Sequence, residues 1–486
     1  MVEDPILNDF DLKRAGMKTS DLWKKLPTAA ELLENPRVKS VVDRLHPNVV
    51  TAQVRTFLDD VRADLAHRAE EANVPSFSEL AERVSRYLSG ADSFKVGGAI
   101  NATGRFRGSP WVSSPLPEAA VERMLLTAQD FTLSVGDGGL SNGHADQDAC
   151  RLLCELTGAE AAAVFSSHPA AIELALRTQT SNNSVVIARG EVGTIDAPCR
   201  LTDLATAANV SLLEVGAADS VNANDYERAL DGRPATVLRM GSTVNPLSAC
   251  RPALEELVQT AKRSGGSVVV ELGGAALRPL AGLEPLLPSL QEAIHTGADL
   301  VLARGDGLIG GPECGIAVGA TAAVERLLGS PLLATCRATG RQAGALAATL
   351  QLHATPERAE LSVPVLSLVT APIDNLKSRA ERLAPQLDAA PQYSAEAVEL
   401  AGSPIGGLPI CLPSWGIRVR PTESTAEALS RRLLERSPAV AAEVEGDSLL
   451  LNLRTVFARQ DLDLVAAFEG NDSAGSDEQS DQPPVV

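Results

Sequence analysis

The chain has 486 residues, 44% of them hydrophobic, which is enough for a large core and more than one domain. Its formal net charge is −19 at pH 7, which excludes binding to DNA by bulk electrostatics, since phosphate contacts need Lys and Arg; a local basic patch stays open. The sequence has no apolar signal region and no run of about 18 apolar residues, so we expect no membrane span and a cytoplasmic location.

The N-terminal part is expected to hold a mobile arm, residues 1–18, and a helical lobe, residues 19–95. In the lobe, apolar residues such as Val54, Phe57 and Leu58 recur at helical spacing. Residues 1–90 carry 13 Lys or Arg and 15 Asp or Glu, so this part is near neutral. A packing and oligomerisation role is therefore at least as well supported as RNA binding.

Apolar runs typical of buried strands alternate with helical patterns through the middle of the chain. The clearest strands end near Phe165, Met240, Glu271 and Ala303. This alternation predicts a large domain, residues 96–352, with a mostly parallel sheet and helices on both faces. A smaller α/β domain is expected over residues 353–468, and an acidic, disordered tail over residues 469–486.

Seven cysteines form no CxxC pair and no Cys/His zinc pattern. Cys150 and Cys154 are four residues apart on a predicted helix, a spacing more typical of packing than of metal binding. We therefore expect reduced thiols and no metal site.

A glycine-rich segment joins two apolar runs, ADLVLA and GIAVG. It reads RGDGLIGGPECG, from Arg304 to Gly315. Glycine allows backbone conformations closed to other residues and lets a ligand approach closely. The alternative is a turn that only needs glycine for its own geometry.

Several of these segments resemble motifs of the bacterial selenocysteine synthases, the L-seryl-tRNA(Sec) selenium transferases, which are fold-type I pyridoxal-phosphate (PLP) proteins. The matching motifs are I-N-x-T-G, G-A-E, R-G-E, E-V-G, G-G-P and L-R-T-V, and the resemblance covers residues 22–468. It implies a helical N-terminal lobe, a large domain with a mainly parallel seven-stranded sheet, and a small C-terminal α/β domain. It also implies a homodimer or higher homo-oligomer.

The chemical motifs match less well than the scaffold motifs. Gly307 stands where the family has its Schiff-base lysine, beside Asp306. Glu271 stands where fold-type I enzymes place the aspartate that pairs with the pyridine nitrogen. The helix start expected to hold the cofactor phosphate carries Ser166, Ser167 and His168, where the family has asparagines. Simple N-capping by Ser167 is an equally weighted alternative.

Substrate-binding positions implied by the resemblance are His144 and Arg337. His144 survives from the G-R-G-H-R-D motif, but Asn142 and Ala145 replace its two arginines. Arginines there would bind an anionic group bidentately, so we expect a weaker substrate site and favour a structural role for His144.

An internal aldimine needs a lysine amine. Of the eight lysines, only Lys262 lies within residues 100–350, on an amphipathic helix; Lys95 lies at the lobe boundary. We therefore expect no covalent PLP. Three hypotheses remain: a diverged homologue without aldimine chemistry, an active PLP-dependent transferase or lyase with a relocated lysine, and a non-catalytic binding or assembly protein. We do not expect tight tRNA binding.

Overall fold

The computed structural model describes residues 26–36, 38–39, 50, 53–59, 61–62, 76–89, 98–106, 114–129, 135–136, 139–140, 145–180, 182–196, 199–241, 251–280, 289–404 and 411–469. The chain divides into two compact units, Met1–Gly98 and Ala99–Val486. The predicted arm, nearly all of the predicted tail, Lys95 and His144 lie outside the described residues.

The first unit is helical where it is described. Its helices include α2 (Ala29–Leu33) and α5 (Phe77–Ser89). Thr28 caps α2: its hydroxyl accepts from the Glu31 N–H, and the Glu31 carboxylate accepts from the Thr28 N–H. Buried apolar residues, among them Leu32 and Leu80, join the helices in one core. The described residues of this unit are thus mainly helical, while the expected bounds of the lobe, residues 19–95, stay a prediction.

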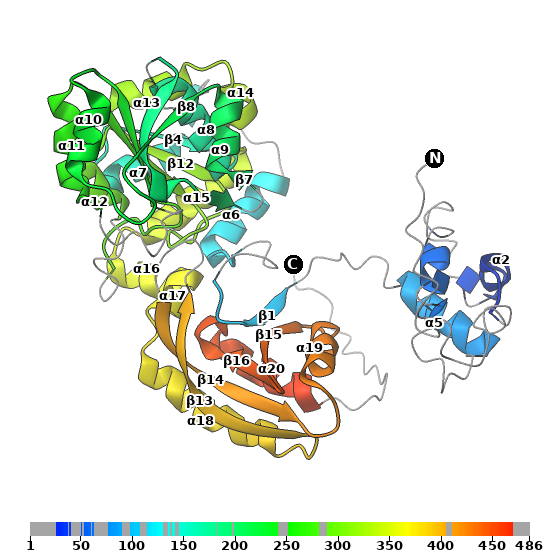
Figure 1. The fold of residues 1–486 in the computed structure, drawn as a ribbon. Coiled ribbons are helices and arrows are strands. Elements are labelled where there is room, and N and C mark those ends of the chain that lie inside the picture. Colours follow the sequence, from blue (N-terminus) through cyan, green and yellow to red (C-terminus); the bar gives the residue numbers. More distant parts are fainter. Residues whose placement is uncertain are drawn as a thin grey trace, which may run out of the picture. The chain divides into compact units, whose positions relative to one another are not determined.

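The second unit contains a seven-stranded sheet among its described residues (Figure 1). Strand β12 (Gly315–Gly319) runs antiparallel to both of its neighbours, β11 (Leu300–Arg304) and β4 (Ala161–Phe165), and the other neighbouring pairs are parallel. The mainly parallel seven-stranded sheet is therefore confirmed. In spatial order the strands are β4 (Ala161–Phe165), β12 (Gly315–Gly319), β11 (Leu300–Arg304), β10 (Ser267–Glu271), β9 (Thr236–Met240), β5 (Ser184–Ala188) and β8 (Ser211–Val215).

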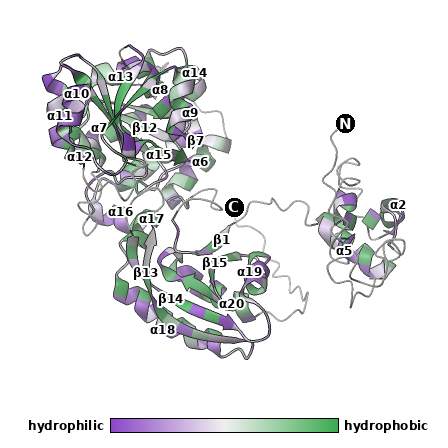
Figure 2. Ribbon diagram, in the orientation of Figure 1, coloured by the Kyte–Doolittle hydropathy of each residue, from purple (hydrophilic) through white to green (hydrophobic). Residues whose placement is uncertain are grey.

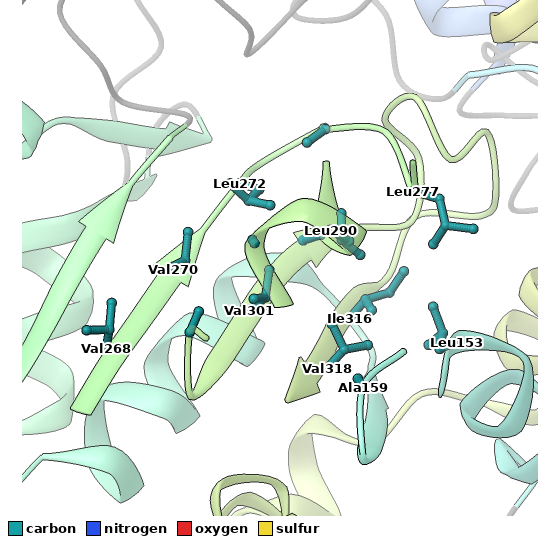
Figure 3. Packing of buried hydrophobic residues seen from close by; sticks show 14 of the residues in the cluster. Leu153, Ala159, Val268, Val270, Leu272, Leu277, Leu290, Val301, Ile316 and Val318 are labelled. Carbon is teal, nitrogen blue, oxygen red and sulfur yellow. The ribbon is translucent and has the colours of Figure 1, made fainter. Parts of the chain in front are cut away.

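Helices cover both faces of this sheet, because side chains along each strand alternate between two cores. On β10, Val268 and Val270 face one core and Val269 faces the other. Figure 3 shows Val268 and Val270 in the first core, with Leu290 nearby. The helices of this region are α6 (Glu118–Gln129), α7 (Gln147–Thr157), α8 (His168–Gln179), α9 (Leu201–Ala208), α10 (Ala223–Leu230), α11 (Leu254–Arg263), α12 (Leu290–His295), α13 (Thr321–Leu328), α14 (Leu333–Cys336) and α15 (Gly340–Leu352).

A five-stranded sheet forms the C-terminal α/β region. In spatial order it contains β1 (Ala99–Ala102), β15 (Ala439–Glu445), β16 (Ser448–Asn452), β14 (Cys411–Pro421) and β13 (Tyr393–Pro404). Its helices are α18 (Ile373–Asp388), α19 (Ala426–Leu434) and α20 (Asp461–Glu469). Helices α16 (Pro356–Ser362) and α17 (Pro364–Val369) follow α15.

The sequence predicted that the large domain begins at residue 96, but strand β1 belongs to the C-terminal sheet. It pairs with β15 in parallel, and buried Ile100 packs in the core of the C-terminal sheet. This placement buries an apolar segment that the large sheet does not take up.

The remaining short elements are connections. They are β2 (Val135–Gly136), β3 (Gly139–Leu140), β6 (Thr194–Asp196), β7 (Cys199–Arg200) and the 3-10 turns η2 (Arg189–Glu191), η3 (Leu453–Thr455) and η4 (Ala458–Gln460).

Hydropathy follows this layering. Figure 2 shows hydrophobic strands inside the large sheet and hydrophilic residues on outer helices such as α10 and α11. Within the described part of the chain, every helix is too short or too polar to cross a membrane.

Candidate functional site

The residues singled out from the sequence meet at one edge of the large sheet. Ser166 follows β4, Glu271 ends β10, and Asp306 follows β11. These three strands point the same way, so their carboxyl ends share an edge, and this is where open α/β sheets bind ligands.

His168 and Glu271 are in direct contact at this edge. His168 Nε2 lies 2.6 Å from Glu271 Oε1, and both side chains are 0% exposed. The same carboxylate oxygen accepts the Gly273 N–H at 2.6 Å. Because a carboxylate oxygen accepts, Nε2 is the ring nitrogen that donates to Glu271. His168 Nδ1 is buried and finds no hydrogen-bond partner within the described part of the chain.

The two serines before α8 have structural roles. The Ser167 hydroxyl accepts from the Ala170 N–H at 3.3 Å, so Ser167 is the N-cap. The Ser166 N–H donates to the Cys336 carbonyl at 2.7 Å, and the Ser166 carbonyl accepts from Gln342 Nε2. The cap uses the Ala170 N–H, and Pro169 has no N–H. The His168 N–H is therefore the first-turn amide that the cap does not use. At this helix start Ser167 therefore acts as an N-cap, which was the alternative to phosphate binding.

The glycine-rich turn is packed against its own chain. A β-carbon on Gly307 would lie 2.6 Å from the Gly274 carbonyl carbon and closer still to that residue's Cα and oxygen. The Leu308 N–H donates to the Gly274 carbonyl at 2.8 Å, which holds the two segments together. At Gly305 a β-carbon would collide with Cys314. The close approach that the glycines permit is thus made by protein atoms.

Arg304 and Asp306 form a buried ion pair in this turn. Arg304 Nε lies 3.0 Å from Asp306 Oδ1, and the side chains are 5% and 7% exposed. Burial raises the pKa of the neighbouring Cys314 thiol, so Cys314 is held as an inert thiol rather than a nucleophile.

Of the two substrate-binding candidates, only Arg337 is described. Its Nη1 lies 3.4 Å from Asp146 Oδ1, and the Arg337 side chain is 25% exposed. Arg337 forms an isolated β-bridge with Phe165, which brings it beside the end of β4. It therefore lies at the expected edge, in a loose ion pair.

The two described lysines of the second unit lie elsewhere. Lys262 is on α11, and its Nζ lies near Gly297, which precedes β11. Gly307 follows the opposite end of β11, and five strand residues span about 16 Å. Lys377 lies over the ring of Trp415 in the C-terminal region.

A buried charge cluster was missed from the sequence. Arg239 Nη1 lies 2.9 Å from Glu191 Oε1, and Arg251 Nη1 lies 3.4 Å from the same atom. Burial lowers the pKa of Arg251. The arginine inside the apolar strand β9 was the available signal, because a buried arginine needs a partner. Among the described residues, no cluster of His, Cys, Asp and Glu is arranged to hold a metal ion.

Comparison with known proteins agrees with this architecture. The family model for L-seryl-tRNA selenium transferase matches residues 100–457. The chain belongs to this family. It is 31% identical over 466 residues to the L-seryl-tRNA(Sec) selenium transferase of Moorella thermoacetica, covering 93% of this chain and 97% of the relative. The Mannheimia succiniciproducens enzyme of the same name is 29% identical over 461 residues, covering 91% and 97%.

A solved structure supports the fold of this family member. The structure of D-glucosaminate-6-phosphate ammonia-lyase matches with a TM-score of 0.55 at 19% identity, covering 76% of this chain and 95% of the other. The fold is the fold-type I fold expected from the sequence. The resemblance drawn from the sequence motifs is therefore confirmed for family and fold.

Proposed function

We propose that this protein is a selenium transferase homologue without internal-aldimine chemistry, which acts as a non-catalytic binding or assembly protein. The observation that carries this proposal is the 2.6 Å contact between His168 Nε2 and Glu271 Oε1 inside the protein. In the family pattern, PLP needs three things here: a carboxylate for its pyridine nitrogen, a helix start for its phosphate, and a lysine amine.

The space that the pyridine ring would need beside the carboxylate is filled. With phosphate at the start of α8 and the pyridine nitrogen on the carboxylate of β10, the pyridine ring would lie between them. The His168 side chain leaves the first turn of α8 and ends on Glu271, so its imidazole takes that space. Both side chains are fully buried, so no room for a second ring remains between their contacting atoms. These residues do not fit the cofactor ring.

The second requirement is weakly met. Ser167 uses its hydroxyl to cap the helix, and Pro169 removes one of the amides that a phosphate would use. The third requirement is not met by the described residues of the second unit, because Lys262 and Lys377 lie away from the carboxyl edge of the sheet.

The rival function is an active PLP-dependent enzyme with a relocated lysine. It would need an amine at the carboxyl edge, and Lys262 lies at the amino end of β11. Lys95 lies outside the described residues. A lysine anchored on α11 cannot cross the sheet without unfolding the strands between, which makes this rival the weaker proposal.

An assembly role has one supporting feature. Helix α6 packs on α15 and leaves Val121, Leu125 and Leu126 43%, 55% and 61% exposed. Adjacent exposed leucines on one helix are typical of an interface. We propose that α6 contributes to a homodimer or larger homo-oligomer, within the region expected from the sequence.

Binding of tRNA is not part of the proposal. The first 90 residues carry 13 basic and 15 acidic residues, so they offer little counterion release on phosphate contact. We expect at most weak binding of serylated tRNA(Sec), with little dependence on salt. A cytoplasmic location stays a prediction.

The proposed function is tested by assaying conversion of seryl-tRNA(Sec) with a selenium donor, with the Moorella thermoacetica relative as the positive control. We expect turnover by the relative and none by this chain, with or without added PLP. Turnover by this chain that rises with PLP would establish the rival function. Tight, strongly salt-dependent binding of seryl-tRNA(Sec) without turnover would instead make the protein a tRNA-binding homologue.

A further inference from the structure

We propose that a cavity beside the carboxyl ends of β10 and β11 binds a small organic anion through Arg278. The cavity has a volume of about 70 Å³, enough for several waters or a short acid. The loop after β10, the turn after β11, and helices α16 and α17 surround it. This inference does not depend on whether the protein binds PLP.

The walls of the cavity are mostly apolar. Leucines from three segments line it, namely Leu277 and Leu280 after β10, Leu308 after β11, and Leu366 on α17. Three polar side chains also line it: Arg278, His353 and Glu360. An apolar pocket with a few polar groups at a sheet's carboxyl edge is the usual form of a small-molecule site.

Arg278 is the group that points to a ligand. Arg278 is half-buried, and among the described residues its buried Nη2 has no hydrogen-bond partner and its guanidinium makes no ion pair with a carboxylate. Arginine stays charged in proteins, so it cannot relieve this situation by losing its proton. A buried donor on a charged group is costly unless something pairs with the charge. A bound anion would supply that pairing.

His353 does not compete for this role. Its Nε2 lies 2.9 Å from the Ile309 carbonyl, which accepts, so the ring carries its proton on Nε2. Burial lowers the pKa of His353, and the positive charge of Arg278 lowers it further. The ring is therefore neutral at pH 7 and serves as a fixed wall. Arg278 is left as the cationic group of the lining.

Carboxylate is the chemistry that fits these features best. A guanidinium binds a carboxylate through two parallel N–H groups, and a short alkyl chain would lie against the leucines. Glu360 lines the same cavity, so an amino acid could place its ammonium there while its carboxylate meets Arg278. A simple acid and an amino acid would both bind through a carboxylate, and the experiment distinguishes the two ligands.

The experiment follows thermal unfolding of the full chain in sodium propionate, in L-alanine, in the uncharged analogue propionamide, and in NaCl at matched ionic strength. The wild type is compared with Arg278→Met and Arg278→Lys. Arg233→Met is the matched control, because the Arg233 side chain is 84% exposed. A ligand that binds the folded state raises Tm in proportion to its saturation.

We expect propionate or L-alanine to raise the Tm of the wild type and of Arg233→Met saturably, with Kd on the order of millimolar for so small a ligand. Arg278→Met should raise the Kd of the ligand at least about tenfold, because this variant loses the charge-assisted hydrogen bond. Arg278→Lys keeps a positive charge and should raise the Kd less. Without ligand, Arg278→Met should unfold at a higher temperature than the wild type, because an unpaired buried donor is gone.

Three results would overturn the proposal. These are no stabilisation of the wild type by either acid, an equal response of Arg278→Met, or an equal effect of propionamide. A response to propionate alone identifies a simple acid as the ligand class, and a stronger response to L-alanine identifies an amino acid. An Arg278→Met protein less stable than the wild type in ligand-free buffer would make Arg278 a structural residue and also overturn it.

Discussion

The imidazole of His168 and the carboxylate of Glu271 lie 2.6 Å apart, although 103 residues separate them in the sequence. The first begins a helix and the second ends a strand, so the contact ties α8 to the middle of the large sheet. Under the proposed function, the same contact leaves no space for a cofactor ring between the helix start and the carboxylate. The stabilising effect of the contact and its proposed excluding effect can both be measured.

Removing the imidazole should destabilise the protein. His168→Ala leaves the Glu271 carboxylate buried with one donor fewer, so we expect a loss of about 2–4 kcal/mol in the free energy of unfolding, measured by urea denaturation. His295→Ala is the matched control, because His295 is exposed on α12, and it should stay within about 0.5 kcal/mol of the wild type. Equal effects of the two substitutions would mean that the contact contributes nothing.

A double-mutant cycle isolates the pair itself. His168→Ala with Glu271→Ala removes both partners, so no carboxylate is left buried. We expect the double variant to lose less stability than the sum of the two single variants. Strict additivity would show that the two side chains do not interact in solution.

Adding a side chain at Gly307 should also destabilise the protein. A β-carbon there would collide with the Gly274 backbone, which cannot swing aside as a side chain does. We expect Gly307→Ala to cost about 1–3 kcal/mol by denaturant unfolding, the usual range for overpacking. Gly340→Ala is the control, because its nearest neighbour, the Ala145 β-carbon, would lie at an ordinary 3.5 Å.

The same collision bears on any attempt to restore the lysine. Gly307→Lys carries the same β-carbon, so we expect it to fold poorly and to gain no pyridoxyl group. A stable Gly307→Lys protein that binds PLP covalently would show that the turn opens easily and that the missing amine alone keeps the site silent.

Much of the scaffold could be predicted from the sequence, because it depends on local patterns. Cys150 and Cys154 lie on a helix, α7, as expected, and strand β10 ends at Glu271 as expected. The place of β1 could not be predicted, because its partner β15 is more than 300 residues away and no local period reports a parallel pairing. The motif match implied a mainly parallel seven-stranded sheet, but the order of the strands came only from the structure.

The candidate site was predictable only in part. The sequence indicated that Ser166, Glu271 and Asp306 follow strands, and parallel strands bring such positions to one edge. It did not indicate that His168 reaches Glu271, because a side chain's direction depends on packing between segments far apart in the chain. It likewise left open whether the glycines admit a ligand or the protein's own backbone at Gly274.

The exposed face of α6 predicts an assembly interface. Leu125→Asp with Leu126→Asp places charges where two apolar side chains are 55% and 61% exposed. We expect the variant to sediment as a smaller species than the wild type while keeping its circular dichroism spectrum. Leu462→Asp is the control, because Leu462 is 76% exposed on α20. A wild type that sediments as a 50.8 kDa monomer would contradict the interface.

His353 predicts a pH dependence of stability. Burial lowers its pKa in the folded protein, and Arg278 adds to this, while Glu360 lines the same cavity. Between the folded value and the unfolded value near 6.5, the unfolded state binds more protons, so stability falls as the pH drops through about 6.5. One such group contributes a slope of at most about 1.4 kcal/mol per pH unit.

The test compares wild type and His353→Gln across this range by urea unfolding at several pH values. We expect the difference in unfolding free energy between the two proteins to shrink as the pH falls below about 6.5, because only the wild type loses this term. A difference that stays constant with pH would mean that His353 is not held neutral by its surroundings.

The central claim is that this protein forms no internal aldimine, and intact-mass analysis after borohydride reduction tests it most directly. The full chain is incubated with PLP, reduced, weighed and digested, beside a known PLP enzyme and a denatured sample of this chain. We predict only scattered labelling of surface lysines, no greater than in the denatured sample. A stoichiometric pyridoxyl group on one specific lysine of the folded protein would contradict the account.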